Sequence, residues 1–472
     1  MKKKITRFAP SPTGYLHIGN IRTALFSWLH SIKNNGIFIL RIDDTDKERN
    51  SNHYTENIIE NLNWLNIEPN IKPIYQSHRK FIYKEIIISL LNKNKAYKCF
   101  CTKERLLKLK EKQIILKKNI KYDKFCLYNN INKKNDNFVI RFKNPIKDSI
   151  NFNDLIKGKI NISNEEIDDF IIAKNNYEVT YNFATVIDDI NMNITDIIRG
   201  EDHISNTAKQ INLIMALNEK IPNFAHLPMV LNKNKKLMSK RNNENSINYY
   251  KNKGFLPKSI LNYILRLGWS YKNKEIFTKK EMITLFNIKD VNKSSCIFDL
   301  NKLIWFNKHY IKQSSIEEIK KYILPIIKKY KINLKYIENL ESVILFQKTR
   351  VSTLKEMILK SICFYKEKNI FNKKINNSLN NNIINCIKSL YKEFENKSYI
   401  WDMINIKNTI KIIINKYNVK LPELANNLRI IITGKNNPYP LFELMFILGV
   451  KLILNKLQIF IKYINNSYTN NN

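Results

Sequence analysis

The sequence is poor in cysteine, in acidic side chains and in long apolar runs, and each shortage excludes a class of protein. Six cysteines in 472 residues do not make a disulfide framework. The apolar run 444–450 is about seven residues long, whereas a membrane span needs roughly 18 or more. The residues after the N-terminal lysines, 5–10, form no apolar signal core. We therefore expect a soluble, cytoplasmic protein with no membrane partner.

Basic residues outnumber acidic ones: the sequence contains 80 Lys and Arg but only 41 Asp and Glu, so its formal net charge is +39. Such an excess favours a polyanionic partner, since cationic surfaces attract phosphate backbones and release counterions. The alternative is a bias of composition: Lys, Asn and Ile are abundant along the whole chain, as in 376–382, which is typical of an AT-rich genome. The charge therefore permits a nucleic-acid partner without establishing one.

The apolar patterns predict an α/β beginning and a helical end. Residues 5–8 and 37–42 are typical of strands, and Ile21, Leu25 and Leu29 share one helical face between them. This strand–loop–helix–strand order is typical of a parallel, nucleotide-binding sheet. From about 99 to 177 the pattern changes to a cysteine cluster, a Lys-rich helix and short strands, which we interpret as an insertion. Beyond about residue 300, glycine is scarce and helical periodicity prevails.

The motif His17-Ile18-Gly19-Asn20 follows a turn that Pro10, Pro12 and Gly14 make irregular. It stands where a helix begins, and the free N–H groups of a helix N-terminus bind anions. There His17 can donate to a phosphate oxygen, and Gly19 removes a side chain where a base or ribose approaches. Taken alone, the motif fits an ordinary helix cap equally well.

The second motif, Met238-Ser239-Lys240-Arg241, lies in a polar stretch from 232 to 245. A flexible cationic loop can close on the negative charge of a transferring phosphoryl group and its leaving pyrophosphate. The alternative for Lys240 alone is a solvated basic loop.

Together, the two motifs resemble the HIGH and KMSKS signatures of class I aminoacyl-tRNA synthetases. Further ordered matches cover nearly the whole chain and make the resemblance specific to glutamyl-tRNA synthetases of the bacterial type. These matches are RFAPSPTGYLHIGN at 7–20, RIDDTD at 41–46, QS at 76–77, RGEDH at 199–203, GFLP at 254–257, LGWS at 267–270 and FDL at 298–300.

The resemblance implies a glutamate–tRNA ligase that activates L-glutamate with ATP and Mg²⁺ and transfers it to the 3′ end of tRNA-Glu. It leaves open whether tRNA-Gln is charged as well, and it implies a monomer. The implied fold is a multidomain α/β plus all-α protein with a Rossmann-type catalytic domain. Its parts would be 1–95 (first half of the catalytic domain), 96–180 (acceptor-end-binding insertion), 181–240 (second half), 241–305 (connecting domain) and 306–472 (α-helical anticodon-binding domain).

The resemblance also implies roles for individual residues. The residues expected to act in catalysis are His17, Asn20 and Lys240. The residues expected at ATP are His17, Gly19, Asn20, Glu201, Met238, Ser239, Lys240 and Arg241. The residues expected at glutamate are Arg7, Ala9, Ser11, Asp43, Tyr181 and Arg199. Arg199 suits this role chemically, because a guanidinium pairs bidentately with a carboxylate. Arg350 is expected at the tRNA anticodon, with a solvated helix face as the alternative.

Three positions depart from the family pattern. Asp43 stands where the family has Glu, which shortens a carboxylate expected to bind the substrate amino group. Leu237 stands at the first Lys of KMSKS, although Lys236 is adjacent. Tyr128 stands at the His of the family's C-x-C…C-x-H zinc site.

A zinc site is therefore expected at Cys99, Cys101 and Cys126, with Tyr122 as the fourth ligand. Thiolates at this spacing favour tetrahedral zinc, and three of them need a fourth donor. The spacing of Tyr122 and Cys126 resembles a Tyr-x-x-x-Cys pattern of related enzymes. The alternative is a cysteine cluster that has lost its metal.

Three other readings compete. A catalytically inactive tRNA-binding paralogue should have lost His17 or Lys240, and both are present. A short relative that modifies tRNA would lack the helical C-terminal region. A glutaminyl enzyme would be expected to carry a β-barrel there, against which the helical periodicity argues.

Overall fold

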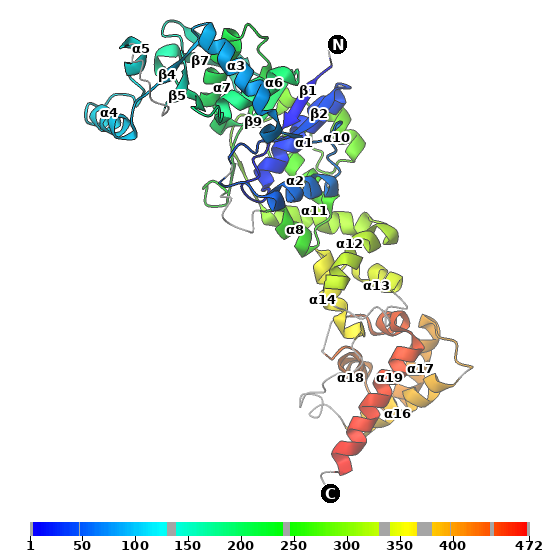
Figure 1. Ribbon diagram of the computed structural model, residues 1–472. Coiled ribbons are helices and arrows are strands. Elements are labelled where there is room, and N and C mark those ends of the chain that lie inside the picture. Colours follow the sequence, from blue (N-terminus) through cyan, green and yellow to red (C-terminus); the bar gives the residue numbers. More distant parts are fainter. Residues whose placement is uncertain are drawn as a thin grey trace. The chain divides into compact units, whose positions relative to one another are not determined.

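The computed structural model describes residues 3–46, 48–129, 138–238, 246–329, 340–365, 380–396, 398–434 and 439–469. The chain divides into two compact units, one of Met1–Lys251 with Pro257–Phe306 and one of Asn252–Leu256 with Asn307–Asn472. The first unit is α/β and the second is helical in its described residues (Figure 1). This division confirms the predicted fold class.

The first unit opens with the predicted strand–helix–strand. β1 (Ile5–Phe8) pairs in parallel with β2 (Ile37–Ile42), and β2 with β3 (Ile74–Tyr75). Parallel neighbours need a crossover connection, and α1 (Ile18–Lys33) supplies it between β1 and β2. Its predicted inner face is buried. Helices α2 (Asn52–Trp64) and α3 (Lys80–Asn92) follow in the chain.

A second sheet has the strand order β7-β6-β10-β9. Its strands are β6 (Ser149–Asp154), β7 (Gly158–Ser163), β9 (Asp196–Gly200) and β10 (Asn223–Leu227). β10 is parallel to both β9 and β6, whereas β6 and β7 form an antiparallel hairpin. The N–H of Thr195 donates to the carbonyl of Ile5 (2.9 Å), so the segment before β9 adjoins β1. Helices α6 (Tyr181–Asn191) and α7 (Ile204–Ala216) complete this part of the chain.

A third sheet, β4-β5-β8, is antiparallel. Its strands are β4 (Ala96–Cys99), β5 (Val139–Phe142) and β8 (Ile171–Lys174), with α4 (Lys103–Ile115) and α5 (Phe125–Tyr128) between the first two in the chain. The unit continues with β11 (Val230–Leu231), which pairs with β12 (Cys296–Ile297). Its later helices are α8 (Ile247–Lys253), α9 (Pro257–Arg266), α10 (Lys279–Leu285) and α11 (Leu300–Gln313), the last part of which belongs to the second unit.

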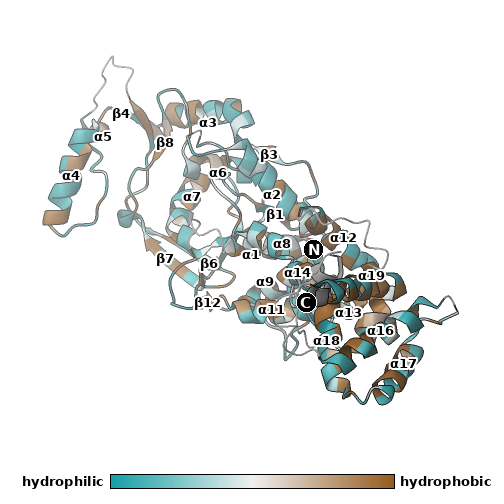
Figure 2. Cartoon of the chain, turned by 90° about the horizontal axis from the view of Figure 1, so that it is seen from below, coloured by the Kyte–Doolittle hydropathy of each residue, from teal (hydrophilic) through white to brown (hydrophobic). Residues whose placement is uncertain are grey.

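The second unit contains α12 (Ile316–Lys329), α13 (Leu340–Gln347), α14 (Leu354–Tyr365), α16 (Asn381–Glu395), α17 (Met403–Lys416), α18 (Leu421–Thr433) and α19 (Leu441–Thr469). The helices from α16 on are amphipathic, and Figure 2 shows hydrophobic and hydrophilic stretches on the same helices. Their apolar residues, together with some from α13, form one buried cluster. Gly434 ends α18 with φ of 76°, a left-handed conformation that glycine adopts without strain.

α19 is much longer than the short apolar run noted in the sequence. Residues 441–466 are long and apolar enough to cross a membrane by length and composition, although a buried core helix passes the same test. Leu444, Ile453 and Leu457 of α19 are fully buried in the core of the helical unit. The helix is interrupted at Gly449, whose backbone is not helical. These contacts make α19 a core helix of this unit.

Candidate active site

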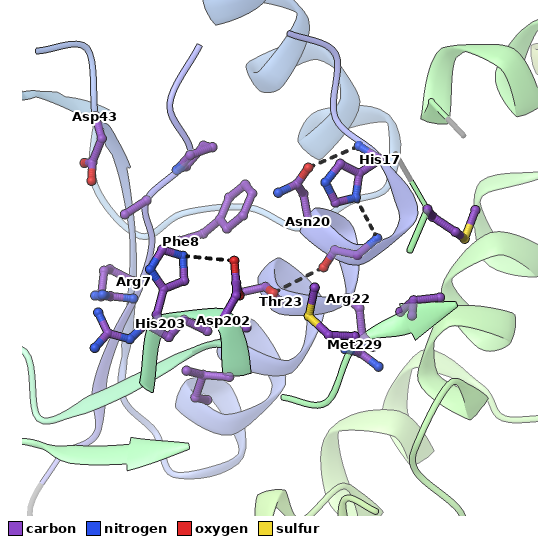
Figure 3. A pocket seen from close by; sticks show the side chains of 18 of the residues that line it. Arg7, Phe8, His17, Asn20, Arg22, Thr23, Asp43, Asp202, His203 and Met229 are labelled. Carbon is purple, nitrogen blue, oxygen red and sulfur yellow. Dashed lines mark hydrogen bonds and ion pairs between the residues drawn. The ribbon is translucent and has the colours of Figure 1, made fainter. Parts of the chain in front are cut away.

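A cavity of about 490 Å³ in the first unit collects most of the predicted catalytic and binding residues (Figure 3). It lies where β2 and β9 end and where α1 begins, the edge of a parallel sheet at which ligands bind. Neither Ser11, which is exposed, nor Glu201, which is half-buried, is among the residues that line the cavity. The predicted residues that do line it are Arg7, Ala9, His17, Gly19, Asn20, Asp43, Tyr181, Arg199 and Met238.

His17 is the N-cap of α1. Its Nδ1 accepts a hydrogen bond from the N–H of Gly19 (3.1 Å), and Oδ1 of Asn20 accepts one from the N–H of His17 (3.3 Å) (Figure 3). The motif therefore caps the helix, as expected for an ordinary helix start. The same residues also line the cavity. Because Nδ1 accepts, a neutral His17 carries its proton on Nε2. Nε2 is thus the atom with which this imidazole can donate to an anion.

Ser239, Lys240 and Arg241 lie outside the described residues. The residues on either side of that segment are described and stand at the cavity. Leu237 and Met238 line it, and Ser246 forms a β-bridge with His17. The residues just before the segment therefore line the cavity, among them Leu237, the departure from the first Lys of the motif, and the residue just after it pairs with His17, which also lines the cavity.

Glu201 supports the wall of the cavity. Its carboxylate accepts a hydrogen bond from the N–H of Met229 (2.9 Å) and forms an ion pair with Lys157. Met229 itself lines the cavity. The carboxylate expected to bind ATP is therefore engaged by a neighbouring backbone and a lysine.

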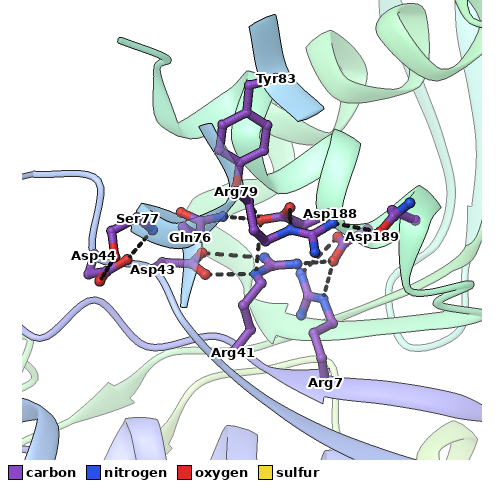
Figure 4. A network of polar contacts seen from close by, with 11 residues as sticks. Arg7, Arg41, Asp43, Asp44, Gln76, Ser77, Arg79, Tyr83, Asp188 and Asp189 are labelled. Atoms are coloured by element: carbon purple, nitrogen blue, oxygen red, sulfur yellow. Dashed lines mark hydrogen bonds and ion pairs between the residues drawn. The ribbon is translucent and has the colours of Figure 1, made fainter. Parts of the chain in front are cut away.

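A buried network of ion pairs lies beside the cavity (Figure 4). Arg41 donates to Asp43 (2.7 Å) and to Asp189 (2.6 Å), and Arg7 also donates to Asp189 (3.1 Å). Neighbouring Asp188 accepts hydrogen bonds from Gln76, Arg79 and Tyr83. The network thus compensates the charges of Arg7 and Asp43, and Arg41, to which the sequence analysis gave no role, holds the Asp43 carboxylate.

Burial raises the pKa of Asp43 to about 6, and the charge of Arg41 opposes this shift. Asp43 is only 3% exposed, and both of its oxygens accept from Arg41, at 2.7 and 3.3 Å. The pKa of this carboxyl group therefore lies well above that of an ordinary aspartate.

Arg199 is buried at the end of β9 and lines the cavity. Its Nη2 donates to Oγ1 of Thr207 (2.6 Å) and its Nε to Nε2 of His226 (3.3 Å). Its Nη1 is buried with no hydrogen-bond partner among the residues that the structure describes. Burial lowers the pKa of Arg199, although Tyr181 and the charge of Asp189 oppose this shift. A ligand carboxylate at Nη1 would give the buried guanidinium a directly bonded counter-charge.

Two further aromatic side chains shape the cavity near Arg199. The hydroxyl of Tyr181 and Nδ1 of His203 are 3.2 Å apart. Burial, together with the charge of Arg199, lowers the pKa of His203 to about 4. His203 is therefore neutral at physiological pH, which leaves Arg199 as a cation beside a neutral imidazole.

The three predicted cysteines converge in the described structure. The sulfur atoms of Cys99, Cys101 and Cys126 lie within 4.8 Å of one another, and those of Cys101 and Cys126 are 3.5 Å apart. The hydroxyl of Tyr122 lies 3.3 Å from the Cys99 sulfur and 3.5 Å from the Cys101 sulfur. Burial raises the pKa of the Cys101 thiol to about 12, so without a cation this thiol stays protonated.

These spacings fit a tetrahedral site. Zinc bonds of about 2.3 Å to sulfur and about 2.0 Å to oxygen imply ligand separations of roughly 3.5–3.8 Å. Tyr122 is 6% exposed, and the Cζ of Arg141 lies 3.9 Å from its ring centre. Tyr128, at the position of the family's His, is 66% exposed. Three sulfurs and the Tyr122 oxygen are therefore the atoms at this cluster that could hold a metal ion.

Arg350, in the helical unit, is already engaged. It donates to the carbonyl of Phe346 and to Glu443 (3.0 Å), and its guanidinium lies 4.1 Å from the Phe346 ring centre. Its side chain remains 30% exposed. These contacts hold the guanidinium in one orientation while part of it stays open to a ligand.

Comparison with known families agrees with this geometry. Residues 3–305 match the catalytic domain of class I tRNA synthetases (E and Q), and residues 315–461 match an anticodon-binding domain. The chain therefore belongs to the class I aminoacyl-tRNA synthetases, in the branch of the glutamyl and glutaminyl enzymes.

Within this class, the relatives with closely similar sequences are glutamate–tRNA ligases. One from Buchnera aphidicola subsp. Cinara cedri (strain Cc) is 48% identical over 98% of both chains. One from Coxiella burnetii is 40% identical over 98% of this chain and 99% of that relative. The crystal structure of a glutamate tRNA ligase from Elizabethkingia meningosepticum, in complex with its amino acid, covers 98% of this chain and 99% of that one, with a TM-score of 0.83 and 28% identity. The resemblance noted in the sequence is confirmed.

Proposed function

We propose that this enzyme activates L-glutamate with ATP and transfers it to the 3′ end of tRNA-Glu. An oxygen of the α-carboxylate of glutamate attacks the α-phosphorus of ATP, the bond to diphosphate breaks, and glutamyl-adenylate forms. A terminal ribose hydroxyl of the tRNA then attacks the glutamyl carbonyl and AMP leaves. The observation that carries the proposal is the buried Arg199 at the cavity, because it offers a charge-matched partner to the side chain that distinguishes glutamate.

The residues that would bind the phosphates of ATP are His17, Asn20 and Lys240. Mg²⁺ would be bound to the same phosphates. His17 would donate from Nε2 to a phosphate oxygen at the start of α1, where the helix dipole also favours negative charge. Lys240 would add a positive charge at the phosphates, because the segment that carries it follows Leu237 and Met238, which line the cavity. No covalent enzyme intermediate is required, so catalysis here consists of positioning and charge stabilisation.

Asp43 would bind the substrate ammonium group, and its raised pKa predicts the pH dependence of glutamate binding. The ionised carboxylate attracts the ammonium, and Asp43 loses that charge as pH falls through about 6. KM for glutamate is therefore expected to rise toward tenfold per pH unit below pH 6, and to level off above it. Steady-state aminoacylation between pH 5 and 8, at saturating ATP and tRNA, measures this.

The matched control for that experiment is D43N, which removes the charge but keeps the shape. Its KM should be high at every pH, without the inflection near 6. An inflection of the same size in D43N would assign the titration to another group.

We propose zinc at Cys99, Cys101, Cys126 and Tyr122. These residues would hold the ion through three thiolates and a phenolate, and zinc would cross-link β4 to the segment that carries α5. The protein is expected to contain about one zinc per chain, measured by metal analysis of dialysed protein. C126S should lose most of the zinc, and Y122F should release it faster to a chelator.

Y128F is the control, because the Tyr128 side chain is exposed. Equal zinc retention in Y122F and Y128F would exclude Tyr122 as a ligand. Absence of zinc from the wild-type protein, and failure to take it up when it is added, would favour a cysteine cluster that has lost its metal.

The remaining proposals concern tRNA contacts, domain roles, oligomeric state and location in the cell. Arg350 would contact the anticodon, and its bond to Glu443 would orient it for that contact. The acceptor-end-binding role of 96–180 and the other domain boundaries expected from the sequence are proposed unchanged. We also propose a monomer in the cytoplasm. An inactive tRNA-binding paralogue is the alternative, and the presence of both His17 and Lys240 in the sequence disfavours it.

Charging of purified tRNA-Glu and tRNA-Gln with labelled glutamate tests the proposal. ATP-dependent charging of tRNA-Glu supports it, and the tRNA-Gln reaction reports whether the enzyme discriminates between them. The R350Q variant is assayed in parallel. If it discriminates between tRNA-Glu and tRNA-Gln as the wild type does, Arg350 does not determine the choice of tRNA. Tight tRNA binding by folded wild-type protein without any charging would establish the inactive paralogue.

A further inference from the structure

A buried pair, Asp154 and His226, lies directly behind Arg199. Asp154 ends β6, whereas His226 is on β10, next to β9, which carries Arg199. Oδ2 of Asp154 is 2.6 Å from Nδ1 of His226, and both side chains are 0% exposed. Neither residue was singled out from the sequence, and β6 falls within the segment interpreted as an insertion.

Asp154 is anchored independently of the imidazole. Its Oδ1 accepts from the N–H groups of Ile156 (2.9 Å) and Lys157 (2.8 Å), and the N–H of His226 donates to Oδ2 (3.1 Å). Hydrogen bonds to its charged form hold the pKa of Asp154 below the ordinary value, against burial. The carboxylate is therefore an acceptor fixed in position, and it requires a proton on Nδ1 of His226.

With the proton on Nδ1, Nε2 of His226 is an acceptor. Two groups from the Arg199 side approach it, Nε of Arg199 at 3.3 Å and Oγ1 of Thr207 at 2.9 Å. Oγ1 of Thr207 also accepts from Nη2 of Arg199 at 2.6 Å. Of the three guanidinium nitrogens of Arg199, Nε is thus bonded to His226 and Nη2 to Thr207. Nη1 is the nitrogen left for a ligand.

We propose that Asp154 and His226 are positioning residues for glutamate selection: Asp154 fixes the Nδ1-protonated tautomer of His226, whose Nε2 then orients Arg199 toward the side-chain carboxylate of the substrate. This inference rests on the proposed function, because it assumes that Arg199 binds glutamate. Neither residue lines the cavity, so neither is a catalytic residue. The arrangement follows the logic of a carboxylate that sets the tautomer of a histidine.

Two substitutions of His226 separate positioning from packing. H226N keeps a donor where Nδ1 lies and removes the acceptor at Nε2, whereas H226Q can place its carbonyl oxygen near the Nε2 position and give up the bond to Asp154. Asp154 retains its three backbone donors in both variants. H226N is expected to raise KM for glutamate roughly 10- to 100-fold, the loss of one hydrogen bond to a charged group. H226Q should raise it less than about threefold, because the acceptor is retained.

D154N tests the tautomer directly. Its amide would donate to Nδ1, move the imidazole proton to Nε2, and so abolish the acceptor for Arg199. D154N should therefore match H226N in KM for glutamate, with KM for ATP unchanged, and the double variant D154N/H226Q should recover toward H226Q. A purely structural role predicts no such recovery, since two buried substitutions would add their damage.

The outcomes distinguish a failure of the Asp154–His226 positioning role from a failure of glutamate binding by Arg199. Equal KM for glutamate in H226N and H226Q, or no recovery in the double variant, would overturn the positioning pair. If R199Q itself leaves KM for glutamate unchanged, the assignment of Arg199 fails instead. Circular dichroism and thermal melts of each variant accompany the kinetics, so that misfolded protein is not scored as a change in KM.

Discussion

Replacing Arg199 by Gln is expected to raise KM for glutamate by on the order of 10²- to 10³-fold. The guanidinium is buried, and its Nη1 has no hydrogen-bond partner in the described part of the chain. A substrate carboxylate there would exchange water for a charge-assisted hydrogen bond from Nη1. Losing one member of such a buried pair costs about 3–4 kcal/mol, which is two to three decades in affinity. Steady-state aminoacylation with varied glutamate measures the effect.

KM for ATP is the internal control for R199Q, because the ATP motifs stand at the start of α1 and on the Met238 side of the cavity. R199K keeps the charge but not the planar fork, so it cannot bond Thr207, His226 and substrate at once. Its KM for glutamate should fall between those of wild type and R199Q. If glutamate and ATP lose affinity equally in R199Q, the cavity has collapsed and Arg199 has no specific role.

H17N is expected to lower kcat about 100-fold while leaving stability unchanged. His17 serves two purposes, because it caps α1 through Nδ1 and borders the cavity. Asn is among the best N-cap residues, so it preserves the cap but removes the imidazole donor. Removing one preorganised donor to developing charge typically costs 10²- to 10³-fold in kcat. Single-turnover adenylate formation with tRNA bound measures this step.

H17A provides the comparison, because it removes both functions. Its kcat should fall as in H17N, and its free energy of unfolding should also drop by about 1 kcal/mol, the usual cost of a lost cap. Denaturant titration of both variants measures that difference. Wild-type kcat in H17N would show that His17 is a cap and nothing more.

Local pattern was enough to predict the elements around the site. The strands 5–8 and 37–42 were predicted with the bounds that the structure has, because short apolar segments between turn-forming residues leave little choice. The helix after His17 was predicted from Ile21, Leu25 and Leu29, which are buried together. The run 444–450 lies within a late helix that the helical periodicity predicts over 441–457, and in the structure α19 continues to Thr469 and packs its apolar face into a helical core.

The contacts between side chains of the site had no signal in the sequence. Asp154, Arg199 and His226 lie on three strands of one sheet, and residues 27 or more positions apart become neighbours only when β10 pairs with both β6 and β9. A buried Asp in a short strand or a His before a Leu is unremarkable by itself. The engagement of Glu201 with Lys157 and Met229, and of Asp43 with Arg41, likewise depends on side chains that meet only in the folded chain.

The sequence by itself determined which chemistry this protein can carry and the order of its domains, since motifs, apolar periods and turn residues are local properties of the chain. It also determined the candidates for zinc binding, although Tyr122 and Tyr128 were both close to Cys126. The tertiary structure alone decided which tyrosine is buried with the thiols, which carboxylates are occupied, and which guanidinium nitrogen is left for a ligand. The physical reason is that burial and pairing set the charge and direction of a polar group, and both depend on residues far away in the chain.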